Sequence, residues 1–84
     1  MKKSEICDLK NLGPTSEKML NSIDIYTLAD IKEAGPVVIC QMLKGFGFNV
    51  NIMMAYALQG AIMDLHWKDI PKEIKEQLRS DLGI

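Results

Sequence analysis

The chain has 84 residues, the size of one small domain. Hydrophobic residues make up 48% of it and charged residues 25%, a balance that excludes a disordered tail and predicts a buried core. The formal charge of -1 excludes a protein that holds nucleic acid by net positive charge alone, so any such contact has to be local.

The pattern along the chain predicts an all-α fold, because no stretch alternates as a half-buried strand does. We expect a compact bundle of five or six short helices in one domain over residues 1–84. The fifth helix is capped by Asn49 or Asn51, Trp67 anchors the connection that follows it, and Pro71 lies in the first turn of the sixth. In chain order the predicted helices span residues 4–11, 14–22, 27–35, 36–44, 51–64 and 71–83, with residues 45–48 as a connector.

Local signals mark several helix ends. Gly13 breaks the first predicted helix, and Pro14 opens the second because its ring presets a helical backbone angle. Asp24 is expected to close the second helix in a left-handed conformation, which Asp tolerates better than most residues. Thr27 and Asp30 have the spacing of a capping box at the start of the third helix.

One face of the predicted fifth helix has almost no side-chain bulk, since Ala57, Gly60 and Ala61 recur at spacings of three and four. A glycine inside a helix costs about 1 kcal/mol relative to alanine, so we expect another backbone to lie close to Gly60. That neighbour is either a helix of the same chain or a helix of a second copy. The candidate interaction surface comprises Met53, Ala57, Gly60, Ala61, Phe46 and Phe48.

The cysteines and the histidine do not form a metal-binding pattern. Cys7 and Cys40 lack CxxC spacing, and His66 is the only histidine, so neither a disulfide framework nor a zinc site is expected. We interpret both cysteines as buried thiols in a reducing cytoplasm. No cofactor and no small-molecule substrate are predicted.

No membrane segment or secretory signal is predicted either. The N-terminus turns acidic at Glu5 and Asp8 before any long apolar run. The uncharged segment 45–63 contains asparagines, a glutamine and glycines, and its unbroken apolar stretch 52–58 is short of the roughly 20 residues that a membrane helix needs. We therefore expect a cytoplasmic protein with a central helix buried on most sides.

A short motif occurs twice in the chain. LKNLGP at residues 9–14 matches IKEAGP at residues 31–36, and each is followed by a helix with an adjacent methionine and leucine. The two segments either form related helix-turn-helix units that pack as a pseudo-symmetric pair, or match by coincidence, because a Gly-Pro helix boundary is common.

Two longer segments resemble a known family. NLGPTSEKMLNSIDIYTLADI, followed by YALQGAIMDLHWKDIP, is similar to the C-terminal domain of TfoX, the bacterial regulator of natural competence, and to its stand-alone relatives. The resemblance covers residues 9–78, nearly the whole chain. It implies a helix-hairpin-helix-like, all-helical fold without catalytic activity. TfoX itself carries a separate N-terminal domain, so the resemblance does not transfer a competence role directly.

Helix-hairpin-helix domains as a class bind DNA without reading its sequence, by directing backbone N–H groups at the start of a helix toward a phosphate. Their turn has a glycine on each side of an apolar residue and a basic residue soon after. Here Asn11 stands at the first glycine position and Thr15 at the basic position, which leaves the turn as either an anion site or a tight connector. The candidate nucleic-acid contacts are Lys10, Gly13, Thr15, Ser16 and Lys18.

Three function classes follow from these patterns. An enzyme is not expected, because His66 has only chance acidic neighbours and no phosphate-binding or nucleophile motif is present. A nucleic-acid module would bind weakly and lose affinity with salt. A protein-interaction or self-associating module, which predicts a homodimer or a protein partner, fits the low net charge and the six methionines best.

Overall fold

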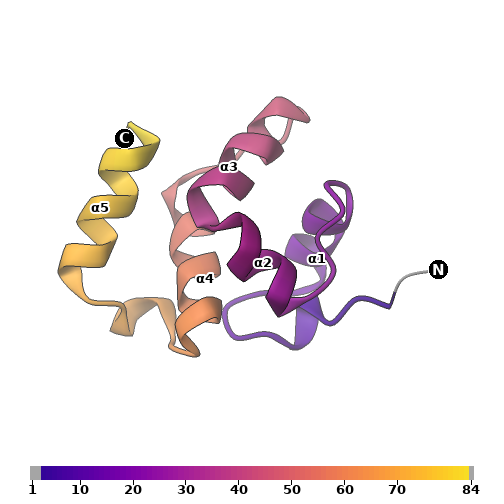
Figure 1. Cartoon of the computed structure of the whole chain (residues 1–84), viewed down its shortest axis with the longest axis horizontal. Helices are drawn as coiled ribbons and strands as arrows, with labels where there is room; N and C mark the ends of the chain where they lie inside the picture. The colour runs from indigo at the N-terminus through magenta and orange to yellow at the C-terminus, as the bar shows by residue number, and fades with distance from the viewer. Residues whose placement is uncertain (1–2, 84) are drawn as a thin grey trace.

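The computed structural model describes residues 3–83, and over this range the protein is all-α, as predicted (Figure 1). Each of the α-helices begins and ends within about two residues of a predicted helix. The elements, with η denoting a 3-10 turn, are η1 (Ile6–Asp8), α1 (Pro14–Asn21), α2 (Leu28–Ala34), α3 (Pro36–Gly45), α4 (Ile52–Met63), η2 (Trp67–Asp69) and α5 (Lys72–Leu82).

The first predicted helix is wrong, because residues 4–11 contain only the single turn η1. The backbone turns to an extended conformation at Leu9, where ψ is 150°. A helix this short gains few internal hydrogen bonds for the residues it orders. Its backbone groups bond elsewhere instead: Cys7 N–H donates to Glu17 Oε2 at 3.1 Å, and Glu5 N–H donates to the Tyr26 carbonyl at 2.9 Å.

The predicted helix ends at the centre of the chain are confirmed. Thr27 Oγ1 accepts from Asp30 N–H at 3.1 Å, while the Asp30 carboxylate accepts from Thr27 N–H at 3.2 Å, which completes the capping box. Asp24 has a positive φ of 69°, as expected for the residue that closes the turn after α1. Of the two candidate caps of α4, Asn51 has that role, since its Oδ1 accepts from Met53 N–H at 2.9 Å.

Helix α5 begins one residue later than predicted, so Pro71 is its N-cap and not a residue of its first turn. The φ of -53° and ψ of 143° at Pro71 lead the chain into the helix from an extended approach. The first helical residue is Lys72, so α5 begins just after the proline.

The two Gly-Pro segments share one feature and differ in another. Pro14 and Pro36 each occupy the first turn of a helix, α1 and α3. The glycines before them differ in conformation, because Gly13 is extended with φ -136° whereas Gly35 has a positive φ of 84°. The sequence motif therefore marks two helix starts that are approached by different backbone paths.

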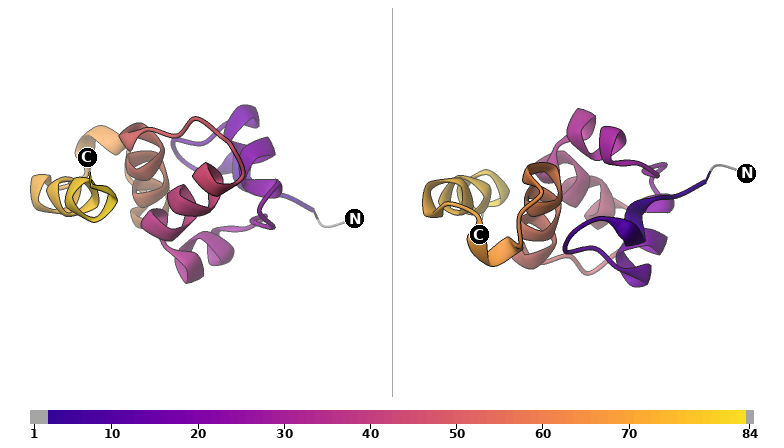
Figure 2. Two further views of the ribbon diagram at one scale, coloured as in Figure 1. Left: turned by 90° about the horizontal axis from the view of Figure 1, so that it is seen from above. Right: turned by 90° about the horizontal axis from the view of Figure 1, so that it is seen from below.

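Helix α4 occupies the centre of the fold. It packs against α2, α3, α5 and η2, and Figures 1 and 2 show it between α5 on one side and the N-terminal elements on the other. No charged residue lies within it, and Ala55 and Leu58 are fully buried. An uncharged helix of this kind is stable only when neighbouring helices cover its sides.

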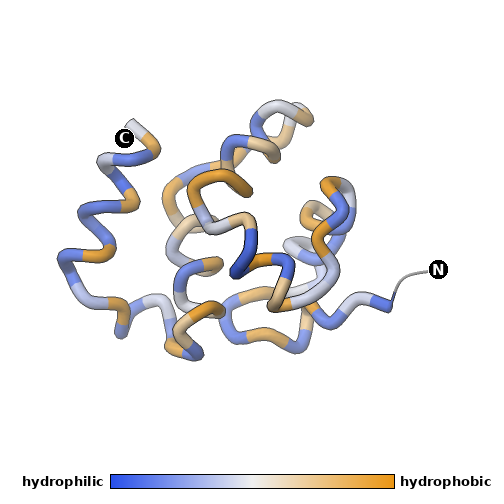
Figure 3. Tube along the Cα trace, in the orientation of Figure 1, coloured by the Kyte–Doolittle hydropathy of each residue, from blue (hydrophilic) through white to orange (hydrophobic). Residues whose placement is uncertain are grey.

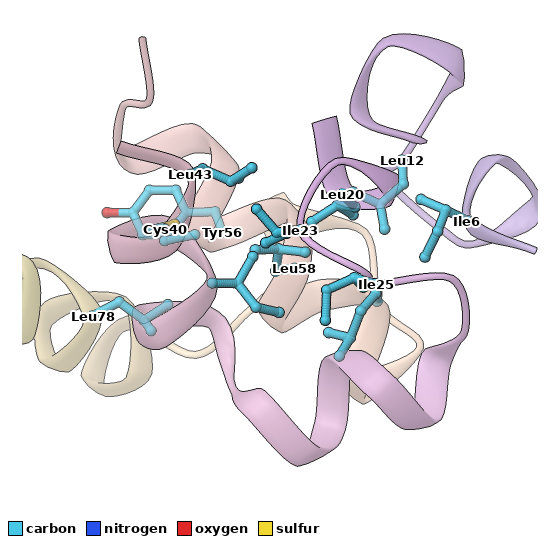
Figure 4. Packing of buried hydrophobic residues seen from close by; sticks show 14 of the residues in the cluster. Ile6, Leu12, Leu20, Ile23, Ile25, Cys40, Leu43, Tyr56, Leu58 and Leu78 are labelled. Carbon is cyan, nitrogen blue, oxygen red and sulfur yellow. The ribbon is translucent and has the colours of Figure 1, made fainter. Parts of the chain in front are cut away.

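The core is one continuous cluster that joins every helix. Figure 4 shows it running from Ile6, Leu12 and Leu20 through Leu58 to Leu78 of α5. Its buried members are Ile6, Leu12, Leu20, Ile23, Ile25, Ile31, Ile39, Cys40, Leu43, Ala55, Tyr56, Leu58, Ala61, Ile70 and Leu78.

Helix α5 lies at the edge of the molecule, and hydrophilic residues dominate it (Figures 2 and 3). Leu78 is its one buried residue. A second attachment comes from Lys75, whose Nζ lies 5.6 Å from the Tyr56 ring centroid and 5.5 Å from that of Trp67, within cation–π range. Trp67, the predicted anchor, is half-buried against the core and so connects α5 to it.

The two cysteines differ in environment, which corrects the prediction that both are buried. Cys40 lies fully inside the core, and burial raises its pKa to about 11. Cys7 is exposed, because Ile6 takes the inward position of η1 and leaves the next residue facing out. Within residues 3–83, no helix is long and apolar enough to cross a membrane.

The hydrogen bonds that the Glu17 carboxylate of α1 accepts from the segment around η1 predict a pH dependence of stability. The Glu17 carboxylate accepts hydrogen bonds from Cys7 N–H and, at 3.0 Å, from Ser4 Oγ, and these bonds hold its pKa below the ordinary value. A carboxyl group with a lowered folded-state pKa stabilises the fold above its unfolded-state pKa, and this contribution is lost as the pH falls through the folded-state value.

We therefore expect Glu17→Gln to flatten the dependence of the unfolding free energy on pH between about pH 6 and about pH 3, where a glutamate titrates. Urea unfolding at several pH values measures this. Glu33→Gln, which changes an exposed carboxylate on α2, is the control and should keep the slope of the parent chain. Equal slopes for the parent and Glu17→Gln would contradict the assignment.

Candidate functional site

The turn between η1 and α1 is bound to the far end of α4 through Asn11. The Asn11 side chain donates from Nδ2 to the Leu65 carbonyl at 2.8 Å and accepts at Oδ1 from Trp67 N–H at 3.0 Å. Its φ is 71°, in the left-handed region that asparagine tolerates. Asparagine here takes a backbone conformation that glycine also adopts freely, while its side chain adds two bonds that glycine cannot make.

Lys10, a candidate phosphate contact, is already engaged by the same end of α4. Its Nζ lies 3.3 Å from the Asp64 carbonyl and 3.7 Å from Asp64 Oδ1. A phosphate would have to compete with this carboxylate for the ammonium group. Lys18, the other candidate lysine, is exposed on α1.

The remaining candidates of this set lie at the start of α1. Gly13 is the N-cap, and Thr15 and Ser16 follow in the first turn, with Thr15 exposed and Ser16 half-buried. Glu17 belongs to the same turn. A carboxylate at a helix N-terminus interacts favourably with the helix dipole and so occupies the electrostatic position that an anion would take.

A groove brings members of the two predicted sets together. It has a volume of about 280 Å³ and lies where the first turns of α1 and α4 meet the connector between α3 and α4. Its lining combines methionine, valine and alanine side chains with hydroxyl and amide groups, and none of its residues is charged, so it suits an apolar side chain better than proton-transfer chemistry. The lining residues are Thr15, Ser16, Met19, Asn49, Val50, Asn51, Met53, Met54 and Ala57.

Gly60 and Ala61 are buried within the chain and do not contribute to an exposed surface. The close neighbour expected at Gly60 is present, but it belongs to loops and not to a helix. A Cβ at Gly60 would collide with Asn11 Nδ2 and lie 2.7 Å from the Leu65 carbonyl oxygen. The absence of a side chain at Gly60 is therefore required by the Asn11 contact.

The aromatic residues of the connector are placed differently from one another. Phe48 is half-buried and packs against the core. Phe46, at the C-cap of α3, has 64% of its surface exposed. Of the predicted interaction set, Phe46 and Met53, which is 40% exposed, are therefore the large apolar side chains that face solvent.

Phe46 belongs to an exposed row along α3 that sequence reasoning did not identify. Val38 and Met42 precede it at intervals of four residues, so the three side chains share one side of the helix. Val38 is 46% exposed and Met42 38%. We call this row, together with the adjacent Gln41 and Gly45, the α3 face.

The α3 face is apolar except for the neutral amide of Gln41, and it carries no charge. The opposite side of α3 holds Ile39, Cys40 and Leu43, all fully buried. The helix is thus apolar on both sides, so periodicity alone could not have shown which side is exposed. The sequence did show that this helix has more apolar residues than one helix face can bury, which indicates that some of them are exposed.

The single histidine has a structural role. His66 precedes η2, and its Nδ1 accepts from Lys68 N–H at 3.2 Å, so one ring nitrogen is engaged as a cap. Within residues 3–83, no three His, Cys, Asp or Glu side chains are grouped so that they could hold a metal ion.

Two glycine substitutions should have opposite effects on stability. Gly60→Ala should lower the unfolding free energy by about 1–3 kcal/mol, because the new methyl group overpacks the Asn11 contact. Gly45→Ala should raise it by about 0.4–1 kcal/mol, because Gly45 is in a helix and a Cβ there meets nothing within 4 Å. Chemical denaturation of dilute protein measures both, and a stabilising Gly60→Ala would contradict the contact.

Comparisons with known proteins bear on the fold and on the family. A search of the curated proteins found no match. A crystal structure of an uncharacterized protein from Listeria monocytogenes, in its triclinic form, has a TM-score of 0.83 to this chain, with 24% identity over 88% of this chain and 84% of that one. That similarity shows a common fold. The family model of the TfoX C-terminal domain matches residues 2–82, and the chain therefore belongs to the TfoX C-terminal domain family.

Proposed function

We propose that this chain is a non-enzymatic binding module that contacts another protein chain through the α3 face. The observation that carries the proposal is the exposure of Val38, Met42 and Phe46 on one uncharged side of a helix. Three of the four large hydrophobic side chains that are exposed in residues 3–83 lie in this row. Contiguous exposed apolar side chains of this kind mark contact surfaces in folded proteins.

The small size of the chain makes this exposure informative. A domain of 84 residues has few apolar side chains to spare, because a small domain buries a smaller fraction of its surface than a large one. Burial of Phe46 in a partner would also remove an aromatic side chain from water, and such residues dominate the energetics of interfaces. Burial of the α3 face by a partner would therefore remove apolar surface from water.

Weak DNA binding through the turn before α1 is the alternative, and fewer observations favour it. The N–H groups of Thr15 and Ser16 lie in the first turn of α1, and Lys18 is exposed. Against this, Lys10 is paired with Asp64, and Glu17 places a negative charge in the same turn. The net charge of -1 offers no general attraction to phosphate.

The regulatory setting of the proposal comes from the family. The resemblance to TfoX suggests that the module works in the control of gene expression or competence in a bacterial cytoplasm. Its part there would be to hold a protein partner, and His66 and the cysteines would serve the fold and not a reaction.

Site-specific photo-crosslinking in the native cells tests the proposal. Phe46→p-benzoylphenylalanine, which keeps the aromatic ring, should give a covalent protein adduct on irradiation, because position 46 faces the partner. The same substitution at Lys32, an exposed residue of α2, is the control and should give none. No adduct from position 46, or equal adducts from both positions, would overturn the proposal.

A parallel titration addresses the alternative. Fluorescence anisotropy of a labelled DNA duplex at low salt should remain unchanged on addition of the protein. A salt-sensitive rise that is lost in Lys18→Ala would instead favour the turn before α1 as a phosphate contact.

A further inference from the structure

We propose that a groove between α5 and the first turn of α3 binds an extended segment of another protein in which two basic side chains flank an apolar one. The groove has a volume of about 380 Å³ and lies where α5 runs beside α3 and α4 (Figure 2). None of its lining residues belongs to the α3 face, so this site is separate from the surface of the proposed function.

Apolar side chains form the more buried part of the groove lining. Leu78 of α5 is 5% exposed, and Val37 of α3 and Ile74 of α5 are half-buried. A side chain placed against them would remove apolar surface from water. The volume of the groove is within the range of about 300–1,000 Å³ that is usual for binding pockets. The groove therefore suits an apolar side chain of a partner.

The exposed part of the lining is acidic. It comprises Glu73, Gln77 and Asp81, which lie one helical turn apart along α5. Gln77 Nε2 donates to Asp81 Oδ1 at 2.8 Å, which holds this carboxylate beside the groove. In the part of the chain that the structure describes, neither carboxylate forms an ion pair, and no lysine or arginine lines the groove. The two negative charges are therefore available to a basic partner.

The basic residues of α5 lie away from the groove. Helix α5 carries three basic and three acidic residues, so its charge as a whole is balanced. Lys72 Nζ lies 3.8 Å from Glu76 Oε1, while Lys75 Nζ lies over the rings of Tyr56 and Trp67. Arg79, two residues after the central glutamine of the groove, is turned by about 200° around the helix axis. The helix therefore presents a negative side to the groove.

The spacing of the two carboxylates indicates the form of the partner. Glu73 and Asp81 are eight residues apart, which is about 12 Å along the axis of α5. In an extended segment, residues i, i+2 and i+4 share one side, and i and i+4 are about 13 Å apart. Basic residues at i and i+4 would thus reach both carboxylates, with an apolar residue at i+2 above Ile74 and Leu78. A small cation could contact only one of the two carboxylates.

The complex should be weak and sensitive to salt. Ion pairs at exposed carboxylates contribute little each and are screened as the ionic strength rises. Their main effect is to select a basic segment over an acidic one, since like charges placed side by side repel. The choice between partners of opposite charge is therefore the property to measure.

A peptide titration of the full chain, followed by NMR of its methyl groups, tests the proposal. The probe is a pool of blocked pentapeptides with lysine or arginine at both ends, serine at the second and fourth positions, and leucine, isoleucine, methionine or phenylalanine at the centre. At low salt and up to about 2 mM peptide, this basic pool should shift the methyl signals of Val37 and Ile74. A pool with glutamate at both ends should leave them unchanged.

Paired variants test the role of the carboxylates. Glu73→Gln together with Asp81→Asn should weaken binding of the basic pool about three- to ten-fold, because both ion pairs are lost while the side-chain shapes are kept. Asp8→Asn together with Glu33→Gln is the matched control. It makes the same change in net charge at exposed residues outside the groove, and it should bind like the parent. Circular dichroism confirms that each variant is folded.

A charge reversal gives the sharpest outcome. Glu73→Lys together with Asp81→Lys should exchange the preference, so that the glutamate-ended pool binds and the basic pool does not. Absence of shifts at Val37 and Ile74 with the basic pool would overturn the proposal. Equal responses to the two pools, or equal weakening by the groove pair and the control pair, would overturn it as well.

The result is independent of the proposed function. The photo-crosslink at position 46 reports on the α3 face, whereas the peptide titration reports on the groove beside α5. Either experiment can therefore fail while the other succeeds, and each outcome is assigned to one surface.

Discussion

Burial of α4 is the constraint on which the rest of the structure depends. This uncharged helix packs against α2, α3, α5 and η2. Leu58 at its middle is fully buried, and the core cluster extends from it to both ends of the chain. With only 84 residues available, α2, α3 and α5 each have to give one side to α4, and their order around it follows from the short connections between them.

The Asn11 contact closes this arrangement. It links the turn before α1 to the chain leaving α4, more than 50 residues later, by bonds of 2.8 and 3.0 Å that lie close to Gly60. The turn before α1 is thus part of an internal contact of the fold, and Lys10 beside it is paired with Asp64. The free-energy cost of leaving the partly buried Leu65 carbonyl and Trp67 N–H unpaired explains why the asparagine amide is used in this way.

What remains outside the core is the α3 face. The buried side of α3 contributes Ile39, Cys40 and Leu43 to the cluster around α4, and this leaves Val38, Met42 and Phe46 without cover within residues 3–83. The exposure of the α3 face is thus a consequence of which side of α3 packs into the core. A neutral, apolar side of a helix matches the proposed binding role.

The sequence by itself determined the all-α class, the family, and the limits of α1 to α5 to within about two residues, because the signals for these are local: Pro14 and Pro36 at helix starts, the Thr27–Asp30 capping box, and an asparagine, either Asn49 or Asn51, before α4. Only the tertiary structure decided that residues 4–11 form a single turn, that Cys7 is exposed, and that the neighbour of Gly60 is the Asn11 amide. It also decided which side of α3 faces solvent. Each of these features depends on contacts between residues far apart in the chain. When a helix is apolar on both sides, its own sequence does not show which side the neighbouring helices will cover.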